Sequence, residues 1–238
     1  MTQTTPFAAA FAQANLPGAV GLIVDRDGIR HAEALGHADV SSGAPMELDT
    51  VCQIASMTKA LVSAGAMQLV EQGRLELDSD IGALLPELAN PQVLTGFDAE
   101  RKPQLRPASR PITLRHLLTH TAGLGYFFIH PEVLQYFAAV GMPAPGSRAS
   151  VTMPLMFDPG ERWEYSVATD WVGLAIEAVT GERLNDYLTA NLFAPLGMAS
   201  TAFRDALPGD AARVHVRSGE GALSRVDVYL GGGEFDGG

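Results

Sequence analysis

Cysteine and long apolar runs are nearly absent from this 238-residue sequence. The single cysteine, Cys52, excludes an intrachain disulfide framework and a cysteine-rich zinc site. No stretch approaches the roughly eighteen apolar residues that a membrane-spanning helix needs. The first residues contain no basic segment followed by an apolar run, so we expect no secretory signal and a cytoplasmic protein.

Positive charge is also scarce. Sixteen lysines and arginines stand against 27 acidic residues, a net charge of −11, and only two of the sixteen are lysines, Lys59 and Lys102. An acidic surface repels phosphates, so we expect neither a nucleic-acid partner nor a membrane partner. The length and the 47% apolar content are sufficient for a sizeable core.

The N-terminal part has the pattern of a helix followed by a β-hairpin. Thr4 or Thr5 can cap a helix that starts at Pro6. The apolar run 19–24 is too short for a helix, and a turn separates it from a second strand at 29–35.

The rest of the chain alternates helical and irregular patterns. Prolines predict mostly irregular structure over 86–111, and a second stretch rich in proline and glycine spans 142–160. The apolar residues 226–230 predict a last strand before a glycine-rich end. Apolar spacings of three and four residues predict helices over 57–72, 113–123, 171–180 and 183–192.

Ser56-Met-Thr-Lys59 lies at the start of the first of these helices. Residues three apart share one helix face, so the Lys59 amine can reach the Ser56 hydroxyl. A serine becomes a good nucleophile when an adjacent base takes its proton, and a desolvated lysine can be that base. Two lysines and twelve serines give about 0.1 chance matches to this spacing, so a capping serine beside a surface lysine stays open.

Aromatic residues and histidines provide further candidates. Tyr165 precedes a predicted helix, where its phenol can carry a proton or can pack beside neighbouring tryptophans. The segment Tyr126-Phe-Phe128 can line an acyl or aryl-ester pocket or pack in the core. His116 and His120 have a zinc-like spacing but no obvious third ligand, so we expect both to be structural, with no metal and no cofactor.

Four segments occur in order along the chain: Ile54–Lys59, Ile112–Leu124, Phe157–Gly160 with Tyr165-Ser-Val167, and Pro195–Met198 with Thr201 and Phe203. Together they resemble the serine β-lactamase-like family, which includes class C β-lactamases, D,D-peptidases and family VIII carboxylesterases. The resemblance is closest to the family VIII carboxylesterases.

The resemblance implies an α+β fold of the β-lactamase/D,D-peptidase type, with an antiparallel sheet flanked by helices and a mostly helical region. Residues 1–238 form one domain, with 1–55 and about 200–238 on the sheet side and about 56–199 in the helical part. By this resemblance Ser56 is the acyl-accepting nucleophile, and Lys59 and Tyr165 share the proton transfers. We expect Tyr126, Phe127 and Trp163 to contact the substrate.

Two departures from the family pattern refine this expectation. Class C β-lactamases usually have asparagine two positions after the tyrosine, where this chain has Val167, so we expect a carboxylesterase for short-chain or aryl esters. The third family motif has no counterpart before Gly238. We therefore expect an incomplete sheet with an open hairpin edge, completed by a missing C-terminal segment or a second chain. Hydrolysis of β-lactams or D-alanyl peptides and a non-catalytic binding role remain the alternatives.

Overall fold

The computed structural model describes residues 5–229, 231 and 233–237 and divides into two compact units. The N-terminal unit comprises Met1–Ile54 and Ala206–Leu230, and the helical unit comprises Ala55–Asp205 and Gly231–Gly238. That both units belong to one domain stays a prediction.

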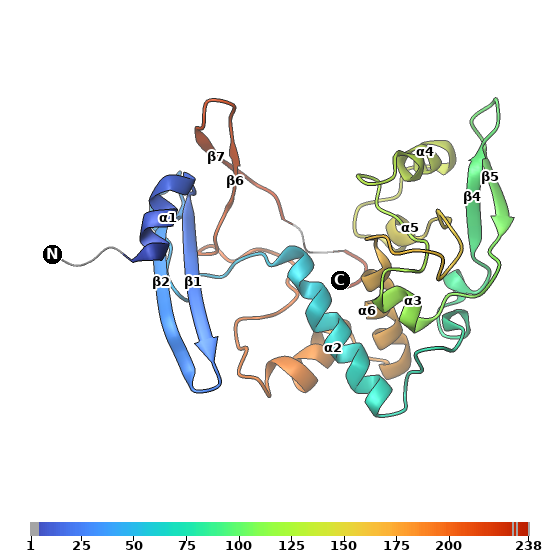
Figure 1. Cartoon of the computed structure of the whole chain (residues 1–238), viewed down its shortest axis with the longest axis horizontal. Coiled ribbons are helices and arrows are strands. Elements are labelled where there is room, and N and C mark those ends of the chain that lie inside the picture. The colour runs from blue at the N-terminus through green and yellow to red at the C-terminus, as the bar shows by residue number, and fades with distance from the viewer. Residues whose placement is uncertain (1–4, 230, 232, 238) are drawn as a thin grey trace. The chain divides into compact units, whose positions relative to one another are not determined.

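The N-terminal unit begins with the predicted helix and hairpin, and both are confirmed. The Thr5 hydroxyl oxygen accepts a hydrogen bond from the Ala8 backbone N–H (3.0 Å), which caps the first helix. The elements of this unit are α1 (Pro6–Ala14), β1 (Gly18–Asp25), β2 (Gly28–Asp39), β3 (Ala44–Pro45), β6 (Val214–Arg217) and β7 (Leu223–Val226) (Figure 1).

The hairpin of β1 and β2 has an open edge within the part of the chain that the structure describes. The sheet order is β1–β2–β3, so β1 pairs on one side only. The apolar side chains Leu22, Ile23 and Val24 of β1 are 57–60% exposed. The expected open edge is therefore present, and what covers it stays a prediction.

The expected strand at 226–230 is wrong. β7 instead ends at Val226, where it pairs with Val214, the first residue of β6. The turn that joins these strands includes Gly221, whose φ of 86° suits glycine. β6 begins at Val214, so the ladder between the two strands ends at Val226, and Leu230 lies outside the described residues.

The helical unit confirms helices near 57–72, 171–180 and 183–192, and it adds α4, which the sequence did not predict. The helix capped by Thr113 ends at Leu118 rather than Gly123, since His120 adopts a left-handed φ of 54°. The elements are η1 (Ala55–Met57), α2 (Thr58–Glu71), η2 (Ile81–Ala83), η3 (Pro86–Leu88), β4 (Gln92–Phe97), β5 (Pro103–Pro107), α3 (Leu114–Leu118), α4 (Pro131–Val140), α5 (Arg148–Val151), α6 (Ala168–Thr180), α7 (Leu184–Leu188) and the π-helical turn η4 (Thr189–Phe193) (Figure 1).

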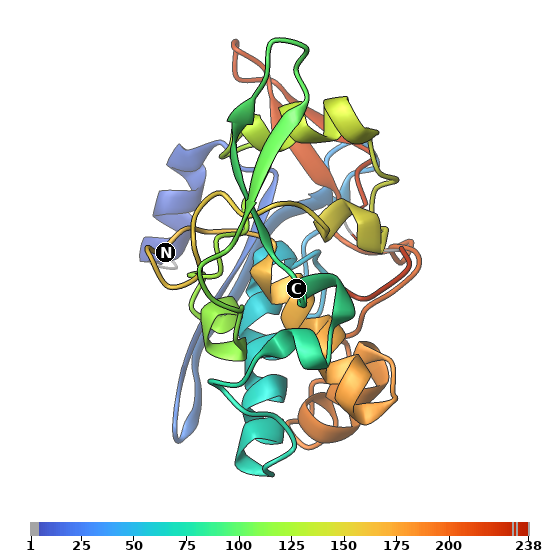
Figure 2. The same cartoon turned by 90° about the vertical axis from the view of Figure 1, so that its right-hand side faces the viewer.

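The prediction of mostly irregular structure over 86–111 is also wrong. In this stretch β4 and β5 form an antiparallel hairpin, drawn in green in Figure 2. Pro103 and Pro107 occupy the two ends of β5. Proline is tolerated at strand ends and free edges, where no ladder hydrogen bond needs its missing N–H. The short helix α5 lies within the second stretch rich in proline and glycine, 142–160.

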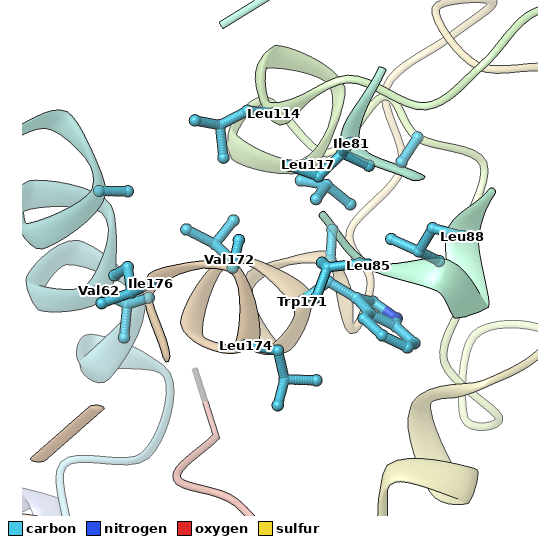
Figure 3. Packing of buried hydrophobic residues seen from close by; sticks show 14 of the residues in the cluster. Val62, Ile81, Leu85, Leu88, Leu114, Leu117, Trp171, Val172, Leu174 and Ile176 are labelled. Carbon is cyan, nitrogen blue, oxygen red and sulfur yellow. The ribbon is translucent and has the colours of Figure 1, made fainter. Parts of the chain in front are cut away.

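The core of the helical unit surrounds α6, from which Trp171, Val172, Leu174 and Ile176 extend among leucines of neighbouring elements (Figure 3). Trp171 is fully buried, and its indole N–H donates to the Val151 carbonyl (3.1 Å). α2 packs directly against α6. The core thus holds α2 and α6 together within the helical unit.

Candidate active site

The structure brings together the three residues predicted to carry the chemistry, all within the helical unit. Ser56 lies in η1, and Lys59 lies in the first turn of α2. The Tyr165 hydroxyl donates to Ser56 Oγ at 2.8 Å, and Lys59 Nζ donates to the same oxygen at 3.4 Å. An exposed serine hydroxyl thus has a phenol and an amine within hydrogen-bonding reach.

His120 positions the segment that carries Tyr165. Its carbonyl accepts the Glu164 N–H (2.8 Å), and its Nδ1 lies 3.3 Å from both the N–H and the hydroxyl of Ser166. The imidazole packs against the Tyr165 ring, with centroids 4.9 Å apart. Burial and the positive charge of Lys59 lower the pKa of His120, which keeps the ring neutral.

Two backbone conformations at the site have no signal in the sequence. Ala55, directly before Ser56, has a φ of 44°, and His120 has a φ of 54°. Side chains other than glycine disfavour this left-handed region, and such residues often mark functional sites. Neither an alanine nor a histidine in a sequence predicts a left-handed backbone conformation, so only the structure could show these turns.

Tyr126 is the one expected substrate-contacting residue whose described contacts join the serine–lysine pair. Lys59 Nζ donates to the Tyr126 hydroxyl at 3.4 Å. Its ring centroid lies 5.5 Å from that of Tyr165. Burial, and then the negative charge of nearby Asp170, raise the pKa of the Tyr126 phenol, so it stays protonated.

Phe127 and Trp163 lie at the surface, with 60% and 66% of their area exposed. Their described ring contacts are with Phe128 and His120, respectively. The structure therefore does not join either ring to Ser56, and their contact with substrate stays a prediction.

Val167 and His116 both have structural surroundings. Val167 is 6% exposed and belongs to the buried cluster, so it contributes to the core at the beginning of α6. His116 Nδ1 accepts the Thr113 N–H (3.2 Å), which completes the cap of α3.

Among the described residues, no three His, Cys, Asp or Glu side chains are grouped as a metal site. In the same part of the chain, every helix is too short or too polar to cross a membrane.

Comparison with known proteins gives the family. The model of the Beta-lactamase family matches residues 6–238. The chain belongs to the beta-lactamase family. It is 36% identical to acyltransferase mokF of Monascus pilosus over 94% of this chain and 58% of that protein. It is 37% identical to lovastatin esterase of Penicillium rubens over 98% of this chain and 60% of that protein.

A solved structure supports the same fold. The LovD6 mutant of simvastatin synthase from Aspergillus terreus matches with a TM-score of 0.81 and 36% identity, covering 92% of this chain and 56% of that one. The expected β-lactamase-like fold is confirmed, and the chain spans a little over half the length of these relatives.

Proposed function

We propose that this protein is a serine hydrolase that forms an acyl-enzyme on Ser56 and cleaves carboxylic esters with short acyl chains or aryl leaving groups. The observation that carries the proposal is the shared hydrogen bonding of Ser56 Oγ with the Tyr165 hydroxyl and the Lys59 amine. Membership of a family that includes a lovastatin esterase supports ester hydrolysis.

Ser56, Lys59 and Tyr165 account for a two-step reaction, in which acylation of the serine is followed by hydrolysis of the acyl-enzyme. Ser56 Oγ attacks the ester carbonyl carbon, and its proton passes to Lys59 in its neutral amine form or to Tyr165 in its deprotonated form. Collapse of the intermediate breaks the bond to the alcohol oxygen, which leaves with that proton. Water then adds to the acyl-enzyme, gives up a proton along the same path, and releases the acid and the free Ser56 hydroxyl. The start of α2 stabilises the negative charge on the carbonyl oxygen.

Esters are favoured over β-lactams because of the residue two positions after Tyr165. Val167 has no group that can hydrogen-bond the side-chain amide of a β-lactam, and it is buried. Comparing turnover of a chromogenic cephalosporin with that of an aryl ester separates the two activities, and a faster cephalosporin reaction contradicts the ester proposal.

Acyl transfer to an alcohol is a second candidate, favoured by the similarity to acyltransferase mokF. Ser56 is exposed, so an alcohol can reach its acyl group as water does. Adding increasing concentrations of a simple alcohol during ester turnover should then form a new ester at the expense of free acid. If free acid remains the sole product, the protein is a hydrolase only.

Covalent labelling tests whether the protein is an enzyme at all. A fluorophosphonate should add its mass to Ser56 in the wild type, and Ser56→Ala should lose both this adduct and ester turnover. Ser200→Ala, at an exposed serine of the same unit, is the matched control and should keep both. A folded wild-type protein that takes no label would favour a non-catalytic binding role.

A further inference from the structure

We propose that Tyr126 is a positioning residue for Lys59, and that its hydroxyl holds the amine in place beside Ser56 throughout acylation. The inference rests on the proposed function and deepens it. It assigns the Tyr126 phenol to the proton-transfer machinery rather than to the wall of a substrate pocket.

The position of the amine is the first argument. Lys59 Nζ lies 3.4 Å from Ser56 Oγ and 3.4 Å from Tyr126 Oη, so it bridges the two oxygens. It also lies 5.9 Å from the ring centroid of Tyr126 and 5.2 Å from that of Tyr165. A lysine has a flexible four-carbon stem and loses much rotamer freedom when it is held in one place. Two rings and a hydroxyl around its head restrict that freedom before the substrate arrives.

The protonation state of the phenol is the second argument. A neutral phenol has both a donor and acceptor lone pairs. The Tyr126 hydroxyl can therefore accept from an ammonium and donate to a neutral amine, and it stays bonded to Lys59 in both states. Because burial raises its pKa, it does not compete for the proton that leaves Ser56.

A link to the segment of Tyr165 is the third argument. The Tyr126 carbonyl accepts the N–H groups of Ile129 (3.0 Å) and His130 (2.8 Å), which closes a turn. The His130 imidazole, when protonated, forms an ion pair with the Glu164 carboxylate, and both side chains are largely buried. Glu164 directly precedes Tyr165, so this pair connects the turn that carries one phenol to the segment that carries the other.

The test separates positioning of Lys59 from contact with the substrate. Tyr126→Phe removes the hydroxyl and keeps the ring. Tyr136→Phe, in α4, makes the same change at a tyrosine outside the site and is the matched control. Two measurements are compared with the wild type: the rate constant for phosphonylation of Ser56 by a small fluorophosphonate, and kcat and KM for an aryl ester.

We expect phosphonylation and kcat of Tyr126→Phe to fall about tenfold, the effect of losing one hydrogen bond to a charged group. KM should be unchanged, and Tyr136→Phe should match the wild type. Glu164→Gln, which keeps the shape but breaks the ion pair with His130, should slow phosphonylation in the same direction and by less.

Other results overturn the inference. If the wild type is labelled and Tyr126→Phe is phosphonylated at the wild-type rate, Tyr126 does not act on Lys59. A rise in KM at that unchanged phosphonylation rate would assign Tyr126 to contact with the substrate. If the wild type is not labelled at Ser56, the proposed function itself fails, and the inference fails with it. Thermal unfolding of each variant identifies a rate loss that comes from unfolding.

Discussion

Replacing Tyr165 by phenylalanine removes one oxygen from the site and leaves the aromatic packing in place. The ring contacts with His120 (4.9 Å) and Tyr126 (5.5 Å) do not involve the hydroxyl, so the segment should keep its conformation. What disappears is the 2.8 Å hydrogen bond to Ser56 Oγ. The variant therefore isolates the contribution of that hydroxyl.

Two roles for the hydroxyl predict losses of different size. A hydrogen bond that only orients Ser56 contributes about 1 kcal/mol, or about fivefold in rate. A group that carries the proton in the transition state contributes about 10²–10⁴-fold. Because Tyr165 makes the shortest polar contact to Ser56 among those described, we expect the larger loss, in kcat and kcat/KM together.

The assay follows the release of an aryl alcohol, with a rapid-mixing phase that separates acylation from deacylation. Both phases should slow in Tyr165→Phe, since a proton moves in each. Tyr136→Phe serves as the control. A loss of about fivefold or less, in a variant with wild-type thermal stability, would refute proton transfer by Tyr165 and leave Lys59 as the base.

Three further predictions concern stability, each checked by urea unfolding. Trp171→Ala should cost about 3–5 kcal/mol, since the indole is fully buried, and an intact midpoint would contradict the core described here. Gly123→Ala should cost about 1–3 kcal/mol because φ is 90° and the new methyl group would collide with the Phe157 carbonyl; a neutral effect would show that this turn relaxes. His120→Asn should lose less stability between pH 7.5 and pH 5 than the wild type. Burial and Lys59 lower the pKa of His120 in the folded state, so the unfolded chain binds the proton more readily, and the free energy of unfolding falls as pH drops below about 6.5; equal pH slopes would contradict this.

Local sequence patterns were sufficient for the first helix, the hairpin that follows it, and the helices α2, α6 and α7. Thr5 caps α1 through its own hydroxyl, and the spacing of apolar residues identifies α2 and α6, because both signals involve neighbours within one or two turns. The hairpin β4–β5 was missed because its prolines lie at strand ends, where the rule against proline does not apply. α4 was not predicted, although it begins with a proline in its first turn.

In the candidate active site, too, local spacing predicted some contacts and only the structure showed the others. The sequence by itself determined that Ser56 and Lys59 lie together, because residues three positions apart at the start of a helix share one face. It also pointed to Tyr165 through the order of motifs, but 109 residues separate that phenol from Ser56, and the 2.8 Å contact depends on how α2 and α6 pack. Only the tertiary structure showed that the Tyr126 hydroxyl contacts Lys59 and that the His120 ring packs against Tyr165. Neither contact follows from spacing along the chain, because each depends on left-handed turns and a buried core that bring distant segments together.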